Sequence, residues 1–445
     1  MSGRPVVAII CMGSAGDLVP YLALAHEIRE KRHGSVLVLT SEAHREMVTA
    51  KGMLFENLGS DPVAEMLKNP KKNIDMDALT KDWLRNSLKA CQEHRPEGVI
   101  FTTMTHLSCS SVCEALQMPF VITHLVPMAP TCEHAPPVFG TADTWFSWTA
   151  HLKWRIFETM AFQMHKKAVQ TVRADFGLGA LSESPILAAR RMQVPLIMGY
   201  TSALCPRPKD WPETIRITGQ WVDSEQEAES SSSQLPQAVS VFLQSAEESG
   251  THVIFVTFGS LLAQCQEIKQ FEKLMEALST AISQAGARAL IATKGCEHFA
   301  IPQSVQVLQQ AGNVLLVPGF LPHGAIMARC LSVICHGGSG TVHTALRAGA
   351  VVIVIPGRRG LIDQTFWGAR VQRSGVGFGP VCSDMLSVKP RALQSVLEAL
   401  LQNSESMKSA AKTMAAFMKS EGGAAEAAEI SLMHFASHPA PTGSS

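Results

Sequence analysis

The sequence predicts an α/β protein of two doubly wound domains, each a parallel sheet covered by helices. Three observations support this. The chain has 445 residues, too many for one ordinary hydrophobic core. Short apolar runs rich in valine and isoleucine alternate with helical patterns along nearly its whole length, as in repeated strand–helix–strand units. The serine-rich stretch DSEQEAESSSSQLPQ, at 223–237, has no apolar periodicity and predicts a linker between the halves.

The predicted elements follow in order. Strands of the first half are expected at 6–11, 35–40, 98–101 and 120–123. Strands of the second half are expected at 253–258, 289–292, 314–317, 331–335 and 351–355. The ending, rich in alanine, methionine and lysine, predicts a helix followed by a frayed tail. We therefore divide the chain into an N-terminal domain (1–222), a linker (223–238), a second domain (239–403), a C-terminal helix (404–435) and a flexible tail (436–445).

Composition excludes several classes of protein. Lys+Arg and Asp+Glu both total 38, and no dense basic run is present, so a nucleic-acid partner is not expected. The 11 cysteines lack paired CxxC spacing, which predicts reduced thiols in a cytoplasmic protein and no zinc site. The apolar run near the amino terminus is too short for a signal peptide or a membrane span, so membrane contact would be peripheral.

A glycine-rich turn, CHGGSGT at 335–341, follows a predicted strand and opens a predicted helix. The start of a helix carries unpaired N–H groups and about half a positive charge, which suits a phosphate or a diphosphate. Glycines let the anion approach the backbone, and hydroxyl and imidazole groups add donors. The residues that supply these groups are His336, Gly337, Gly338, Ser339, Gly340 and Thr341. The alternative is a plain glycine turn.

Two further strand ends in the second half carry polar residues. VTFGSL offers Gly259 and Ser260, which would hold a diphosphate from a second side. In IPGRRGLIDQTFWGARV, Asp363 and Gln364 open a helix. A carboxylate beside a side-chain amide suits the vicinal hydroxyls of a sugar, although a simple helix start is the alternative.

The first turn, MGSAGDLVPYLALA, places Gly13, Gly16 and Asp17 at the end of the first strand. Its spacing is not GxGxxG and no acidic residue ends the second strand, so a nicotinamide enzyme is disfavoured. Asp17 has two interpretations. It could cap the following helix, or it could act as a general base if a partly dry site raises its pKa.

Histidines compete with Asp17 for the role of base. His106 and His124 each end a strand-like run, and His134 lies in PTCEHAPP. A structural hydrogen bond is the alternative role for each. The DxD pair Asp75 and Asp77 follows the polar segment KNPKKN and is expected at a solvated helix start, so no metal site is predicted.

These motifs resemble those of nucleotide-sugar glycosyltransferases with two Rossmann-like domains, the GT-B fold. They are most similar to those of sterol glucosyltransferases and bacterial transferases of antibiotic aglycones. In that group the first turn reads about G[ST]RGDxxPxLALA, and this chain has GSAGDLVPYLALA. The second-domain pattern is about HHGGAGTxxxxLRAGVPxxxxPxxxDQxFWGxRV, and this chain has CHGGSGTVHTALRAGAVVIVIPGRRGLIDQTFWGARV.

The resemblance implies an inverting, metal-independent enzyme whose domains face each other across a cleft. It would transfer a hexose, glucose from UDP-glucose, to the hydroxyl of a sterol or similar lipophilic acceptor. No cofactor is expected besides the UDP-sugar co-substrate. The N-terminal domain would bind the acceptor, with Asp17, His124 or His134 as catalytic residues. The donor-binding residues implied are Gly16, Gly259, Ser260, Phe320, Leu321, His336, Gly338, Ser339, Gly340, Thr341, Asp363 and Gln364.

The chain departs from the family pattern at several positions. Ala15 and Cys335 replace an arginine and the first histidine of the HH pair, and Arg358 and Arg359 make the PGRRG stretch unusually basic. Thr344 stands where plant small-molecule transferases carry a ribose-binding glutamate. Two alternatives stay open: a transferase for a macrolide, polyketide or phenolic aglycone, and a non-catalytic protein that binds nucleotide sugars.

Overall fold

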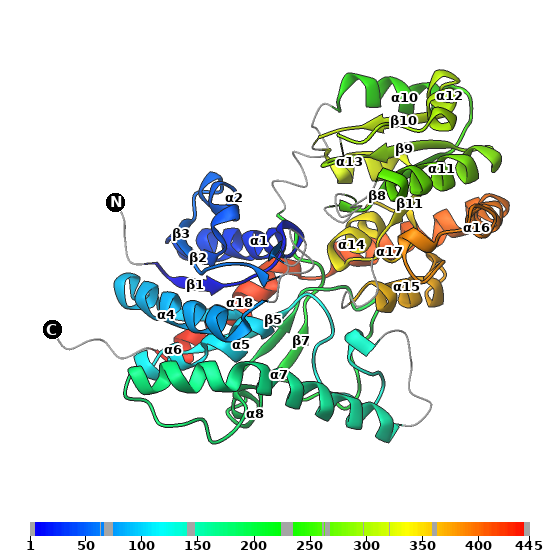
Figure 1. The fold of residues 1–445 in the computed structure, drawn as a ribbon. Helices are drawn as coiled ribbons and strands as arrows, with labels where there is room; N and C mark the ends of the chain where they lie inside the picture. The colour runs from blue at the N-terminus through cyan, green and yellow to red at the C-terminus, as the bar shows by residue number, and fades with distance from the viewer. Residues whose placement is uncertain are drawn as a thin grey trace.

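A computed structural model shows two parallel sheets, each with helices on both faces, which confirms the predicted α/β class (Figure 1). The structure describes residues 5–62, 64–65, 74–139, 147–223, 235–259, 262, 268–296, 298–319, 321–357 and 363–439. The first sheet has seven strands in the order β3-β2-β1-β4-β5-β6-β7, and the second has six in the order β10-β9-β8-β11-β12-β13. In both sheets the strand order reverses beside the first strand of the domain, where doubly wound folds bind ligands.

The strands are short and parallel throughout. Those of the first sheet are β1 (Val7–Ile10), β2 (Val36–Thr40), β3 (Leu54–Asn57), β4 (Gly98–Thr102), β5 (Phe120–His124), β6 (Leu196–Met198) and β7 (Ile215–Ile217). Those of the second are β8 (Val253–Thr257), β9 (Arg288–Ala292), β10 (Val314–Val317), β11 (Ser332–Cys335), β12 (Val351–Val354) and β13 (Gly377–Phe378).

Helices connect the strands on both faces of each sheet. The N-terminal domain contains α1 (Ala15–Arg32), α2 (Arg45–Ala50), α4 (Met76–His94), α5 (Thr103–Cys109), α6 (Ser111–Leu116), α7 (Ser147–Asp175) and α8 (Pro185–Arg191). The rest of the chain contains α10 (Gln237–Glu248), α11 (Ile268–Gln284), α12 (Gln303–Gln310), α13 (His323–Arg329), α14 (Ser339–Arg347), α15 (Gln364–Arg373), α16 (Pro390–Gln402), α17 (Ser404–Ser420) and α18 (Gly423–Ser437).

Strand β1 shows how the apolar runs build the core. Its side chains point alternately to the two faces of the sheet. Val7 and Ile9 join the core beneath α1 and α18, whereas Ala8 and Ile10 join the core beneath α4. Because both faces are covered, the strand is apolar at every position and not at alternate ones.

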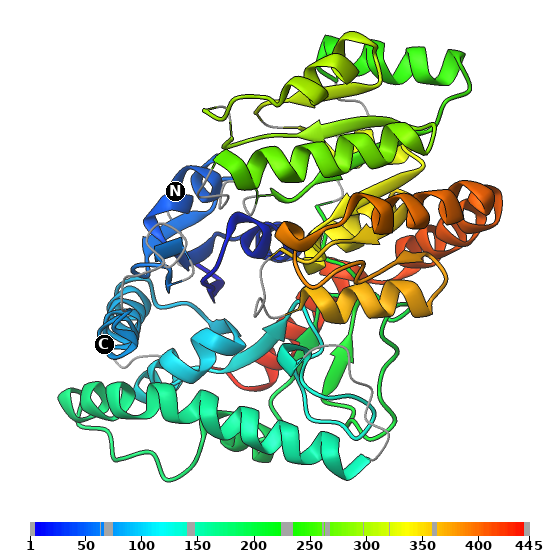
Figure 2. The same ribbon diagram turned by 45° about the vertical axis from the view of Figure 1, so that its right-hand side comes forward.

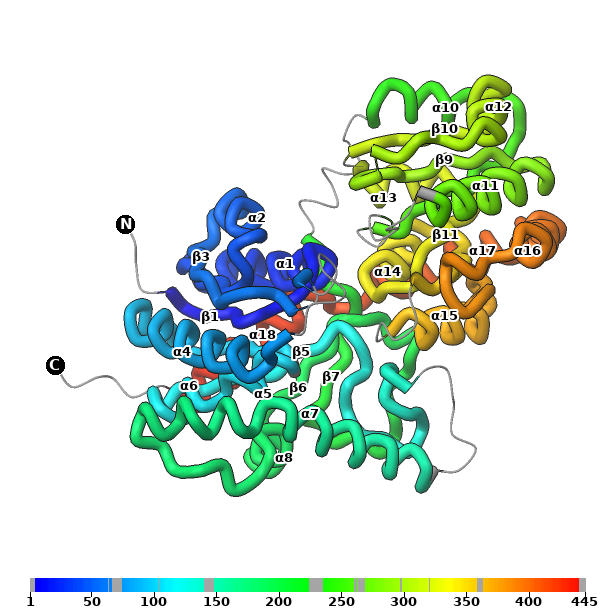
Figure 3. Tube along the Cα trace, viewed as in Figure 1, coloured from blue at the N-terminus to red at the C-terminus, as the bar shows by residue number. Residues whose placement is uncertain are grey.

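The C-terminal segment differs from the single helix expected at 404–435. It forms two helices, and the chain bends at Glu421 and Gly422, just before Gly423, which has a left-handed φ of 57°. In the second domain α17 packs on α14, and α18 crosses back to pack on α1 of the first (Figure 3). Within the expected linker, α10 already begins at Gln237, while 224–234 lie outside the described residues.

The two domains share an apolar core. One cluster of buried side chains contains Tyr200 and Trp211 from the first domain with Phe366 and Trp367 from the second. The Tyr200 and Trp367 ring centroids lie 5.7 Å apart. In Figure 1 the second domain lies above and to the right of the first sheet. The shared core therefore fixes how the strand ends of the two domains face each other.

Candidate active site

The start of α1 presents Asp17 at the end of β1. Its Oδ2 accepts hydrogen bonds from the Ser14 amide and the Ser14 hydroxyl, at 2.9 and 2.8 Å. Gly13 has a φ of 146°, and a Cβ there would lie 2.7 Å from the same oxygen, so this turn requires glycine. Asp17 thus does support the helix start. Its Oδ1, however, accepts no hydrogen bond from any residue that the structure describes, and its side chain reaches solvent.

The surroundings of Asp17 favour its protonated form. Desolvation by the protein on either side raises the pKa of its carboxyl, while the bonds from Ser14 lower it. The nearby carboxylate of Asp61 raises this pKa further, and His44 lowers it. The Nε2 atom of His44 lies 3.0 Å from the Gly13 carbonyl oxygen, which ties it to the same turn. A raised pKa is what a general base working near neutral pH needs.

The glycine turn after β11 is built for close approach. Gly337 has a φ of 91°, and a Cβ there would lie 2.6 Å from Val354 and 2.7 Å from the Gln364 carbonyl oxygen. A Cβ on Gly338, the N-cap of α14, would lie 2.5 Å from the Nε2 atom of His336. The imidazole of His336 therefore packs against bare backbone at the start of the helix. Burial lowers its pKa to about 4, so the ring is neutral at pH 7, and its Nδ1 is buried without a hydrogen-bond partner among the described residues.

The side chain of Asp363, which precedes α15, reaches the start of α14 beside the glycine turn. Its Oδ2 accepts hydrogen bonds from the Ser339 amide and from Nε1 of Trp367, both at 3.1 Å. Desolvation raises the pKa of Asp363 to about 6; the Ser339 bond opposes this and the negative charge of Asp17 adds to it. The carboxylates of Asp17 and Asp363 are thus close enough to influence each other across the domain boundary.

The starts of α1 and α14 meet at that boundary. A Cβ on Gly340 would lie 3.7 Å from the Gly16 carbonyl oxygen. The Ser339 hydroxyl donates a 2.9 Å hydrogen bond to the carbonyl oxygen of Leu125, just after β5. The geometry therefore brings an acidic side chain of one domain to the anion-binding end of a helix in the other.

The chain is similar to known glycosyltransferases in sequence and in fold. The chain is 26% identical over 454 residues to the sterol 3-beta-glucosyltransferase UGT80A2 of Arabidopsis thaliana, covering 97% of this chain and 66% of the relative. It is 24% identical over 386 residues to the sterol 3-beta-glucosyltransferase of Saccharomyces cerevisiae strain YJM789, covering 83% of this chain and 30% of the relative. The family model described as Erythromycin biosynthesis protein CIII-like, C-terminal domain, matches residues 296–433. The solved calicheamicin glycosyltransferase CalG4 superimposes with a TM-score of 0.66 at 15% identity, covering 98% and 99% of the two chains.

This chain has the GT-B fold of glycosyltransferases. It is a relative of the sterol glucosyltransferases, and it spans about two thirds of the plant relative and under one third of the yeast relative.

Several donor residues expected in the GT-B pattern have structural roles. Gln364 is buried, and its Oε1 accepts a 2.7 Å hydrogen bond from the Gly357 amide, so it holds the chain after β12. Leu321 is buried in the shared core. Gly259 has a left-handed φ of 54°, and a Cβ there would lie 3.8 Å from the His336 ring. Thr341 lies half-buried in the first turn of α14.

Some expected residues cannot be placed. Ser260 and Phe320, and the basic pair Arg358 and Arg359, lie outside the described residues.

The candidate histidines are packed in the interior. His124, at the end of β5, is buried and its pKa is lowered to about 3 by desolvation. His106 stacks on Phe120, with ring centroids 5.3 Å apart. His134 lies against Phe366 of the second domain at 5.9 Å, and its Nδ1 is 3.0 Å from the Ala135 carbonyl oxygen. Since Asp17 reaches solvent and these rings are enclosed, the arrangement favours Asp17 as the base.

The structure shows the surroundings of two of the departures, Cys335 and Thr344. Cys335 is a buried strand residue, and burial raises the pKa of its thiol to about 12, so it stays neutral. Thr344 accepts a hydrogen bond from Gln220 of the first domain at 3.4 Å. This position thus contacts the other domain.

Sequence reasoning missed three residues of the site. His44 and Asp61 act on Asp17 but lie far along the chain and belong to no motif. Trp367 is part of the FWG motif, and its bond to Asp363 could have been suspected from the spacing of four residues on a helix.

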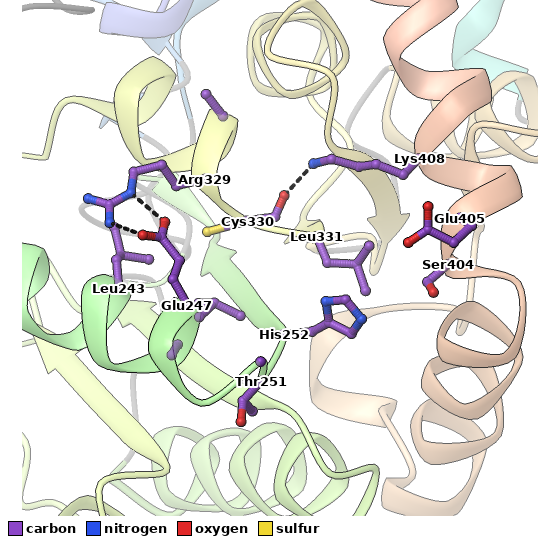
Figure 4. Close-up of a pocket in the computed structure, with 14 residues that line it drawn as sticks. Leu243, Glu247, Thr251, His252, Arg329, Cys330, Leu331, Ser404, Glu405 and Lys408 are labelled. Carbon is purple, nitrogen blue, oxygen red and sulfur yellow. Dashed lines mark hydrogen bonds and ion pairs between the residues drawn. The ribbon is translucent and has the colours of Figure 1, made fainter.

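The cavity in Figure 4 is separate from this site. It has a volume of about 470 Å³ and lies where β8 and β11 begin, at the opposite end of the sheet from the glycine turn. Arg329 pairs with Glu247 at its edge, and Lys408 donates to the Cys330 carbonyl oxygen. It therefore belongs to the opposite end of the second domain.

Proposed function

We propose that this chain transfers a hexose from a nucleotide sugar to the hydroxyl of a sterol or a similar lipophilic alcohol. The hexose is glucose and the donor is UDP-glucose. The observation that carries the proposal is the meeting of Asp17 with the start of α14 at the domain boundary. The names of the sterol glucosyltransferase relatives support the acceptor class. The rhamnosyltransferase SpnG, a solved structure with a TM-score of 0.63 and 14% identity, was obtained with thymidine diphosphate, which supports a nucleoside diphosphate donor.

In this proposal the second domain holds the donor. The diphosphate lies at the start of α14, where the backbone amides of Gly340 and Thr341 donate hydrogen bonds. The neutral ring of His336 adds one N–H donor. Asp363, ionised above its pKa of about 6, accepts hydrogen bonds from hydroxyls of the sugar.

The first domain supplies the base. The free Oδ1 of Asp17 takes the proton of the acceptor hydroxyl while the hydroxyl oxygen attacks the anomeric carbon. The bond between that carbon and the diphosphate oxygen breaks, and its electron pair leaves with the diphosphate. The amides at the start of α14 stabilise the charge that develops there, which is the role we assign to the protein in place of a metal. Attack from the face opposite the leaving group inverts the anomeric configuration.

A second candidate acceptor is a macrolide or polyketide aglycone. The match of residues 296–433 to a model named for erythromycin biosynthesis favours it. That match covers the donor side, whereas the sterol glucosyltransferase relatives match the acceptor domain as well, so the sterol class is preferred.

The test is a product assay. The chain is incubated with UDP-glucose, UDP-galactose or UDP-glucuronate and with a panel of sterols, macrolides and phenols, and products are detected by mass. We expect a sterol hexoside from UDP-glucose, with the β configuration by proton NMR. A chain that neither transfers nor hydrolyses the sugar of any donor, but binds UDP, would be a non-catalytic relative.

A further inference from the structure

The outer face of α7 carries a stripe of exposed apolar side chains. Its members recur every four residues and are each between 45% and 65% exposed: Trp148, Leu152, Ile156, Met160 and Met164. Most other large apolar side chains that are exposed in the described chain are scattered singly, as is normal for a soluble surface. Five in one row over 17 residues of a single helix are unusual.

The opposite face of α7 explains why this helix is stable without the stripe. Trp154, His165, Ala168 and Val172 are buried there against the rest of the N-terminal domain. A spacing of four residues turns the stripe by about 40° per step, so from Trp148 to Met164 it winds through about 160° over about 24 Å of helix. This arc excludes the buried residues, so the whole stripe lies on the side of α7 that faces away from the domain. In Figures 1 and 2, α7 lies along the outer border of the N-terminal domain.

The charges of α7 indicate what covers the stripe. Its two acidic residues are neutralised, because Glu158 pairs with Arg190 and Asp175 pairs with Arg85. Arg155 and Lys167 are exposed and form no ion pair within the part of the chain that the structure describes. The free charge of this face is therefore positive. An apolar stripe with basic flanks is the pattern of helices that lie in the plane of an anionic membrane surface.

We propose that the outer face of α7 docks the protein on a lipid bilayer with anionic headgroups. The stripe enters the boundary between headgroups and acyl chains, and Arg155 and Lys167 contact lipid phosphates. No helix among the described residues is long and apolar enough to cross a membrane, so the contact is in-plane. The proposal does not depend on sugar transfer, since it concerns binding alone.

The first experiment is co-sedimentation of the full chain with phosphatidylcholine vesicles, with and without phosphatidylserine. We expect the wild-type chain to bind the vesicles with phosphatidylserine. The double variant Leu152→Glu with Met160→Glu should bind at least about tenfold more weakly. The matched control is Val241→Glu with Val307→Glu, two exposed apolar positions on helices of the other domain, and it should bind like wild type. Because all four side chains are exposed, thermal melting should be unchanged in both variants.

Two further readouts separate a membrane from other partners. Replacing Arg155 and Lys167 by glutamine should weaken binding to vesicles that contain phosphatidylserine, by about fivefold for each charge removed. Binding to vesicles of phosphatidylcholine alone should not change. Among the described tryptophans Trp148 is the exposed one, so Trp148→Phe should abolish a blue shift of fluorescence on vesicle addition. Equal vesicle binding by wild type and the Leu152→Glu, Met160→Glu variant would overturn the proposal. So would an absence of binding by wild type, or a dimer in light scattering that this variant dissociates.

Discussion

At the scale of the residue, the account depends on the ionisation of Asp17. Asp61 raises the pKa of this carboxyl and His44 lowers it. A base must be ionised, so kcat/KM should fall as the pH drops through the pKa of Asp17, which lies above its ordinary value.

The fall of kcat/KM at low pH is the acidic limb of the pH profile. Two substitutions should move this limb in opposite directions. Asp61→Asn removes a repelling charge and should shift the limb to lower pH. His44→Gln removes the opposing influence and should shift it to higher pH. The measurement is the pH profile of kcat/KM for sugar transfer, with wild type alongside. Shifts in the same direction for both variants would contradict this view of the Asp17 environment.

The sequence revealed the residues of the site that lie next to a turn. Asp17, Ser339 and Asp363 each follow a predicted strand, and parallel strands bring their carboxyl ends to one edge. His44 and Asp61 could not be found this way, because their effect on Asp17 arises only after β1 and the segments that follow β2 and β3 come together.

At the scale of the element, the start of α14 requires glycine at position 337 more strictly than at position 340. At Gly337 a Cβ would meet backbone within 2.7 Å and φ is left-handed, whereas at Gly340 the nearest atom is 3.7 Å away. Gly337→Ala should therefore lower the free energy of unfolding by about 2 kcal/mol or more. Gly340→Ala should change it by no more than about 0.5 kcal/mol.

Urea denaturation of both variants measures this contrast. Equal losses of stability in Gly337→Ala and Gly340→Ala would show that the turn is not held as described.

Elements with a clear apolar run were predicted and weak ones were not. Strands β6, β7 and β13 have only two or three residues, too few for a periodic pattern. Strand β3 was missed as well, because its sequence LFEN has only two apolar residues. The break between α17 and α18 was overlooked because the alanine-rich composition continues on both sides of Gly422 and Gly423.

At the scale of the whole molecule, the domains are joined by aromatic packing that no motif predicts. Phe366 is 4% exposed and contacts His134 of the other domain. Phe366→Ala should lower the free energy of unfolding by about 3–5 kcal/mol, because it leaves a cavity in the shared core. Phe417→Ala, at an exposed position on α17, should change it by about 0.5 kcal/mol or less.

Urea denaturation followed by tryptophan fluorescence compares these two variants. If Phe366→Ala were as stable as Phe417→Ala, the shared core would not hold the domains together.

The central claim, that Asp17 of one domain removes a proton while the other domain holds the donor, is tested most directly by Asp17→Asn. Asparagine has the same shape and its oxygen can still accept the bonds from Ser14, so the start of α1 should stay intact. We predict that the initial rate of sterol hexoside formation falls about a hundredfold to ten-thousandfold, while UDP-glucose affinity by calorimetry stays within about twofold of wild type. A rate within about tenfold of wild type would contradict the account.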